Sequence, residues 1–105
     1  MDEATRESYK EKARVARVLA NENRLMIIDA LRDGEMSVQS LAEKLQLDQS
    51  TISKNLSILK SMGIVRDRRA GNKVYYFLRA RCILNFFSCA NEVIMTSIED
   101  KTAAL

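Results

Sequence analysis

The chain of 105 residues is 47% hydrophobic and carries a formal net charge of +3, values that fit one compact domain with a single core. It has no histidine, no glycine-rich phosphate loop, no apolar run long enough to span a membrane, and a charged N-terminus without an apolar leader. We therefore predict one domain over residues 1–105 of a cytoplasmic protein that is neither an enzyme nor a membrane protein.

Two helices are predicted in the first third of the chain. A stripe of apolar residues at helical spacing indicates a helix over residues 3–20. The stripe consists of Tyr9, Ala13, Ala16 and Ala20. Asn21 can cap a second helix, which we expect Gly34 to end in a left-handed conformation. The residues of this second helix expected to face the core are Leu25, Ile28 and Leu31, with Met26 and Ile27 widening the apolar surface.

Residues 37–62 have the pattern of a helix-turn-helix. Ser37 and Asp48 can each cap a helix, and Leu47 can fill the angle between the two. The second helix, residues 49–62, has a polar edge without an acid, so it would not repel phosphates if it entered a DNA groove. The residues that we predict to contact the groove are Gln49, Ser50, Thr51, Ser53, Lys54 and Ser57. An ordinary helical hairpin with a solvated Ser/Thr face would share this pattern.

Strand-favouring residues on both sides of Gly71-Asn72 predict a β-hairpin over residues 64–79. Near its tip, Arg68, Arg69 and Lys73 suit a wing that contacts phosphate or the minor groove, although a hairpin can also merely cover a core. Residues 49–81 hold eight basic residues and one acid, a net charge of +7, which leaves −4 for the remainder. Such segregation is typical of nucleic-acid binders.

A last helix is predicted over residues 82–98, with a loose tail over residues 99–105. Its apolar residues cover more than one face, which is more than a small domain can bury. A second copy of the chain is the simplest partner for the excess.

Three phrases of the chain resemble the ArsR/SmtB family of bacterial metal- and thiol-responsive repressors. They are VLANENRLMIIDAL (residues 18–31), STISKNLSILKSMGIV (50–65) and RRAGNKVYYFL (68–78), and the likeness covers Val15 to Ile94. The resemblance implies a mainly α (α+β) winged helix-turn-helix of five helices with one two-stranded β-hairpin wing. It also implies a homodimer that binds palindromic double-stranded operator DNA and leaves it when an inducer binds.

By the same resemblance, the helices 1–20 and 82–98 form the dimer interface. The interface residues that we predict are Tyr9, Ala13, Ala16, Phe86, Phe87, Ala90, Val93 and Ile94. The chain departs from the family at Glu22-Asn23, where a proline and a threonine are usual. Ser37 and Gln39 stand where arsenic-responsive members have two cysteines, and a chain without histidine cannot build the zinc, cobalt or nickel site that other members have on the last helix.

Cys82 and Cys89 are the remaining candidates for a sensor, although a cysteine on an apolar helix is usually a core residue. Seven helical residues rise about 10.5 Å, whereas a disulfide requires Cα atoms roughly 4.4–6.8 Å apart. Either Cys82 lies in a turn and folds back, or the last helices pair antiparallel so that Cys82 of one chain meets Cys89 of the other. A thiophilic species would suit them: trivalent arsenic, Cd(II), Hg(II), Cu(I), an oxidant or a persulfide donor.

The sequence thus predicts a DNA-binding transcriptional repressor that is released from its operator by a thiol-reactive inducer at Cys82 and Cys89. Two alternatives stay open. One is a constitutive winged-helix DNA binder without a sensor site, and the other is a winged-helix module that binds protein.

Overall fold

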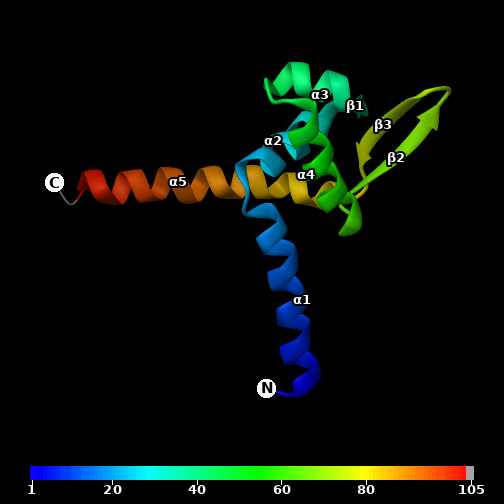
Figure 1. Cartoon of the computed structure of the whole chain (residues 1–105). Coiled ribbons are helices and arrows are strands. Elements are labelled where there is room, and N and C mark those ends of the chain that lie inside the picture. The colour runs from blue at the N-terminus through cyan, green and yellow to red at the C-terminus, as the bar shows by residue number, and fades with distance from the viewer. Residues whose placement is uncertain (104–105) are drawn as a thin grey trace.

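The computed structural model describes residues 1–103 and has the predicted winged helix-turn-helix fold with five α-helices (Figure 1). In chain order the elements are α1 (Glu3–Leu19), α2 (Glu22–Ala30), β1 (Met36–Ser37), α3 (Val38–Leu45), α4 (Gln49–Ser61), β2 (Val65–Ala70), β3 (Lys73–Leu78) and α5 (Asn85–Ala103). Short 3-10 turns at Leu31–Asp33 and Arg81–Leu84 follow α2 and precede α5. No helix within these residues is both long enough and apolar enough to cross a membrane.

Capping residues fix where the helices begin. Each cap places a side-chain oxygen on a free backbone N–H of the first turn, which otherwise lacks a partner. The four cap distances are 2.7 Å for Asp2 to the Thr5 nitrogen, 3.0 Å for Asn21 to Arg24, 3.1 Å for Ser37 to Ser40, and 2.6 Å for Asp48 to Thr51. The caps predicted at Asn21, Ser37 and Asp48 are therefore confirmed.

The wing is the antiparallel pair β2 and β3, in register from Val65 opposite Leu78 to Ala70 opposite Lys73. Gly71 takes a φ of +65° in the turn between them, a conformation that glycine adopts without a steric penalty. The short strand β1 adds to the other side of β3, which makes a sheet of three strands in the order β1-β3-β2. The sequence analysis predicted only two strands. It missed β1 because a segment of two residues is too short to show the alternating pattern of a strand.

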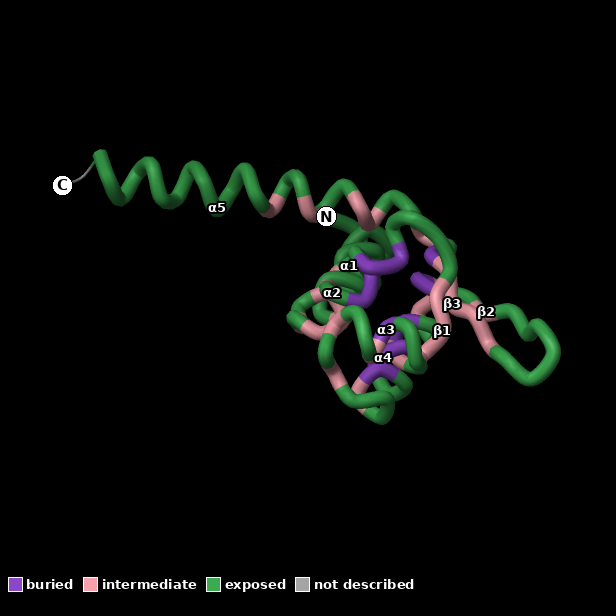
Figure 2. Tube along the Cα trace, turned by 90° about the horizontal axis from the view of Figure 1, so that it is seen from above, coloured by how far each residue is buried: buried purple, intermediate pink, exposed green. Residues whose placement is uncertain are grey.

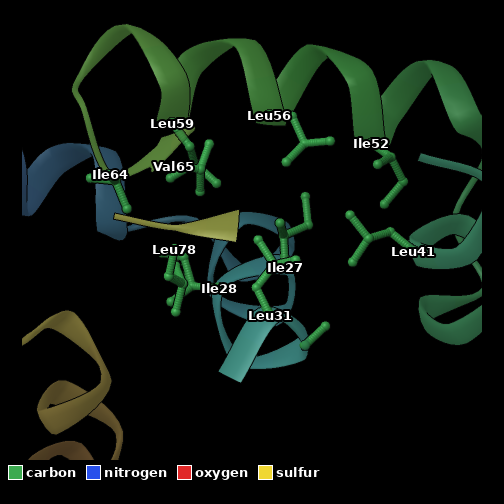
Figure 3. Close-up of a cluster of buried hydrophobic side chains, with 11 residues drawn as sticks. Ile27, Ile28, Leu31, Leu41, Ile52, Leu56, Leu59, Ile64, Val65 and Leu78 are labelled. Carbon is green, nitrogen blue, oxygen red and sulfur yellow. The ribbon is translucent and has the colours of Figure 1, made fainter. Parts of the chain in front are cut away.

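The core lies between α2, α3, α4 and the base of the wing, as Figure 3 shows. Its fully buried side chains are Ile27, Ile28, Leu31, Leu41, Ile52, Leu56, Leu59 and Val65. Leu25, which we expected to face the core, is only half-buried, whereas Ile27 and Ala30 are buried. The helix α2 packs against α1, α3 and α4 at once, so its buried residues do not form a single stripe.

The helices α1 and α5 project from this body in different directions, and most of their surface is exposed (Figures 1 and 2). The helix α5 begins at Asn85, later than predicted, because residues 81–84 form a 3-10 turn. The tail predicted over residues 99–105 is wrong for residues 99–103, which continue α5, and the last two residues lie outside the described range. The prediction followed the apolar pattern, which stops at Ile98, whereas three good helix formers, Glu99, Lys101 and Ala103, lie beyond it.

Leu56 offers a direct test of the contact between α4 and the core. Its side chain is 0% exposed, so Leu56→Ala should lower the free energy of unfolding by about 2–5 kcal/mol through lost burial and a residual cavity. Urea denaturation followed by circular dichroism, at one fixed chain concentration, measures this change. The neighbouring exposed residue provides the control, since Ser57→Ala should change stability by less than about 0.5 kcal/mol. Equal effects of the two substitutions would contradict this packing.

Candidate nucleic-acid interface

The helix α4 presents a polar face to solvent because its apolar face is fixed in the core. Ile52, Leu56 and Leu59 are 0% exposed, which orients the opposite side of the helix outward. The predicted groove residues lie on that outward side: Gln49, Ser50, Ser53, Lys54 and Ser57 are exposed, and Thr51 is half-buried. No acid occurs between Gln49 and Ser61, so this face offers hydrogen-bonding groups and one cation near its centre.

The turn between α3 and α4 sets the angle between these two helices. Gln46 adopts a left-handed conformation with a φ of +54°, which reverses the chain within a few residues. Leu47 then packs against the core, as the sequence predicted. Asp48 accepts hydrogen bonds from the Thr51 backbone N–H and from the Ser50 hydroxyl at 2.8 Å. The Thr51 backbone N–H lowers the pKa of the Asp48 carboxyl, so this cap stays ionised at neutral pH.

Arg68, one of the three predicted wing cations, forms an ion pair within the chain. Its Nε donates to Oε2 of Glu35 at 2.8 Å, its Nη2 donates to the other carboxylate oxygen, and its guanidinium carbon lies 5.1 Å from the Tyr75 ring centroid. The sequence gave no sign of this pair because its partners are 33 residues apart. Glu35 therefore belongs to the candidate site, beside Arg68, Arg69 and Lys73.

The pair between Glu35 and Arg68 is complete at neutral pH. The Arg68 guanidinium lowers the pKa of the Glu35 carboxyl, and the carboxylate in turn raises the pKa of Arg68. A lowered carboxyl pKa favours the folded state at pH values above the ordinary pKa of glutamate, and this contribution is lost as the pH falls through the lowered value. The pair therefore stays ionised throughout the neutral range.

The other two predicted wing cations are available to a ligand. Arg69 and Lys73 are exposed and take part in no ion pair or side-chain hydrogen bond with any described residue. Asp67, the one acid between residues 49 and 81, lies 3.0 Å from the Lys60 ammonium. The acids nearest the wing are thus paired, which leaves uncompensated positive charge at its tip.

The predicted dimer residues differ in their exposure to solvent. Tyr9, Ala16, Phe86, Val93 and Ile94 are exposed, and Ala13 and Ala90 are half-buried. Phe87 partly covers the core of its own chain and lies 5.7 Å from the Arg32 guanidinium carbon. Phe87 thus packs in part against its own chain, and its predicted role in the dimer stays a prediction.

Both cysteines are exposed free thiols. Cys82 lies in the 3-10 turn, and Asn85 continues that turn directly into α5 with a helical φ of −65°. Because the backbone between Cys82 and Cys89 is helical throughout, it spans more than about 10 Å. Of the two predicted arrangements, the one in which Cys82 folds back toward Cys89 is thus absent. Residues 1–103 also contain no group of three or more cysteine or carboxylate side chains that could hold a metal ion.

Asn55 is a residue of this helix that the sequence analysis missed. It is 6% exposed, on the inner side of α4 between the apolar positions 52, 56 and 59. A polar residue on the apolar face of an amphipathic helix is a sequence signal that could have identified it, because a buried amide requires hydrogen-bond partners.

Comparison with known proteins places this geometry in a family. The profile described as "Bacterial regulatory protein, arsR family" matches residues 21–67. The HTH-type transcriptional regulator Rv0324 of Mycobacterium tuberculosis is 36% identical over 88% of this chain, which spans 41% of that regulator's length. The arsenical resistance operon repressor of Staphylococcus aureus is 37% identical over 68% of this chain and 68% of its own length.

A solved structure extends the match to nearly the whole chain. The homodimeric winged helix-turn-helix DNA-binding domain of a Mycobacterium bovis protein has a TM-score of 0.77 and 32% identity, and the match covers 95% of this chain and 93% of that one. The sequence motifs, the fold and these likenesses agree. The chain belongs to the ArsR family of bacterial regulatory proteins.

Proposed function

We propose that this chain is a homodimeric transcriptional repressor that binds operator DNA with α4 and its wing. One observation carries the proposal: the exposed side of α4 is polar and free of acids, and it lies in a chain whose wing tip holds two unpaired cations, Arg69 and Lys73. An α-helix with short hydrogen-bonding side chains fits the major groove, and cations on a neighbouring wing suit the phosphate backbone.

A second copy of the chain would cover the projecting helices. Large apolar side chains are well exposed on both: Tyr9 is 56% exposed on α1, and Val93, Ile94 and Met95 are 64%, 54% and 55% exposed on α5. Isolated helices of this length gain most of their stability from packing. A two-fold dimer would supply that packing and would place two copies of α4 on the two halves of a palindrome.

The same dimer would create the inducer site. Since one chain cannot join its own cysteines, we propose that two α5 helices pair antiparallel and bring Cys82 of each chain to Cys89 of the other. The two-fold axis would then pass near Asn85 and Phe86, midway between the cysteines. Two thiols there could bind a soft metal or metalloid, or an oxidant could take two electrons and two protons from them to form a disulfide. Either reaction would shift the dimer interface and the spacing of the two α4 helices.

The lysine on the outer face of α4 tests the groove contact. Lys54→Ala should weaken operator binding by about 5- to 100-fold, the range expected for one lost base or phosphate contact. Fluorescence anisotropy against a labelled duplex at fixed salt measures the change. Lys101→Ala removes the same charge near the far end of α5, and it should leave the affinity within about twofold. A matching loss in both variants would refute a specific role of α4.

The ion pair at the wing gives an electrostatic test. Glu35→Gln removes the charge that holds Arg68, so the freed guanidinium should tighten DNA binding at low salt and steepen the dependence of log affinity on log salt concentration by up to about 1. Glu43→Gln, a carboxylate on α3 that forms no ion pair in the described structure, controls for general charge removal. A weaker affinity in Glu35→Gln alone would mean instead that the pair holds the wing in its binding position.

Single cysteine variants test the arrangement across the dimer. After mild oxidation, wild-type chains should run as covalent dimers on a non-reducing gel and release the operator. Mixing Cys82→Ser with Cys89→Ser chains should still give cross-linked dimers, because one Cys82–Cys89 pair survives in each mixed dimer. Either variant alone should give none. Arsenite and Cd(II) are tested in parallel by anisotropy, and unchanged release in the double variant would remove the sensor from the proposal while leaving DNA binding intact.

A further inference from the structure

A chain of hydrogen bonds connects the end of α1 to the inner side of α4. On α4, the buried Asn55 donates from Nδ2 to the Thr51 carbonyl at 2.9 Å and accepts at Oδ1 from Nη1 of Arg24 at 3.1 Å. Arg24, on α2, also donates from Nε to the Val18 carbonyl in the last turn of α1 at 2.6 Å. One guanidinium thus joins three helices.

These hydrogen bonds depend on direction, whereas the apolar packing around them does not. Apolar packing by Ile52, Leu56 and Leu59 keeps α4 on the body but is tolerant of small rotations about the helix axis. A planar guanidinium with two hydrogen bonds fixes both the distance and the orientation of its acceptors. The amide of Asn55 is almost fully buried, so loss of its partner would leave a polar group unsatisfied. Arg24 therefore links the inner side of α4 to the end of α1 through bonds of defined direction.

Arg24 has no acid to pair with. None of the ion pairs among residues 1–103 includes it, although its side chain is half-buried. The acceptors that it does use are a helix-end carbonyl and an amide oxygen, both neutral. Hydrogen bonds donated by a cation are stronger than neutral ones, and the planar guanidinium also fixes the direction of each bond.

We propose that Arg24 and Asn55 are positioning residues that set the rotation of α4 against α1 and thereby the spacing between the two reading helices of the dimer. This inference rests on the proposed function, since it requires that α1 contributes to the dimer and that α4 binds DNA. Arg24 and Asn55 need no contact with DNA. Their effect is on which separation of two half-sites the dimer accepts.

Half-site spacing gives the test. Duplexes are first selected from a random library by wild-type protein, and the selected site is rebuilt with one or two base pairs added or removed between its halves. By anisotropy, wild type should prefer one spacing over its neighbours by about tenfold or more. Asn55→Leu and Arg24→Met should weaken binding at the best spacing by roughly tenfold and reduce the preference between spacings to within about threefold.

Two further variants test whether the spacing preference depends on the hydrogen-bond geometry rather than on general loss of charge. Asn55→Asp keeps an oxygen acceptor for Arg24 and should retain the spacing preference. Arg17→Met removes a nearby guanidinium on α1 that forms no side-chain hydrogen bond in the described structure, and it should leave the preference unchanged. Thermal melting verifies that each variant is folded. Where Asn55→Leu or Arg24→Met does not fold, Arg24→Lys takes its place, because a point-like ammonium on a different stem does not reproduce the planar fork.

The outcomes are distinct. A wild-type protein that selects no duplex contradicts the proposed function itself. A wild-type preference that persists in Asn55→Leu and Arg24→Met overturns the positioning role alone. A loss of affinity that is equal at every spacing also overturns it, because it would show that the two residues only support the fold.

Discussion

Burial of one side of α4 is the constraint on which the other features depend. Ile52, Leu56 and Leu59 are fully buried against α2 and the base of the wing, so the opposite side of α4 must face solvent. Successive residues of a helix are about 100° apart around its axis. A shift of the buried stripe by a single position would turn the polar side away from the surface. The core thus determines which side chains are available to a groove before any DNA is present.

Three acids around that surface have donors of their own. Glu35 binds Arg68, Asp48 binds the first turn of α4, and Asp67 binds Lys60. These pairs place the carboxylates in fixed positions and reduce the repulsion that they would exert on phosphates. Among the cations without partners in the described structure, Arg69 and Lys73 stand at the tip of the wing, where an approaching polyanion would meet them.

Local signals in the sequence were sufficient for most of the fold. The caps at Asn21, Ser37 and Asp48, the apolar spacing in α4 and the Gly71-Asn72 turn depend on residues close together in the chain. The pairs Glu35–Arg68 and Arg24–Asn55 could not be predicted, because each joins segments more than 30 residues apart and no sequence period reports such contacts. The last residues of α5 were missed for a different reason: the apolar pattern ends before the helix does, and the prediction relied on that pattern.

If the chain dimerises through the projecting helices α1 and α5, as proposed, its stability depends on its abundance. A single chain leaves both helices largely exposed, so association through them would supply part of the free energy that keeps them helical. When most chains are single, the amount of a dimer formed through these helices rises with the square of the chain concentration. While a palindromic site is mostly unoccupied, its occupancy would then rise with the square of the protein level, and a twofold drop in that level would lower the occupancy by more than half.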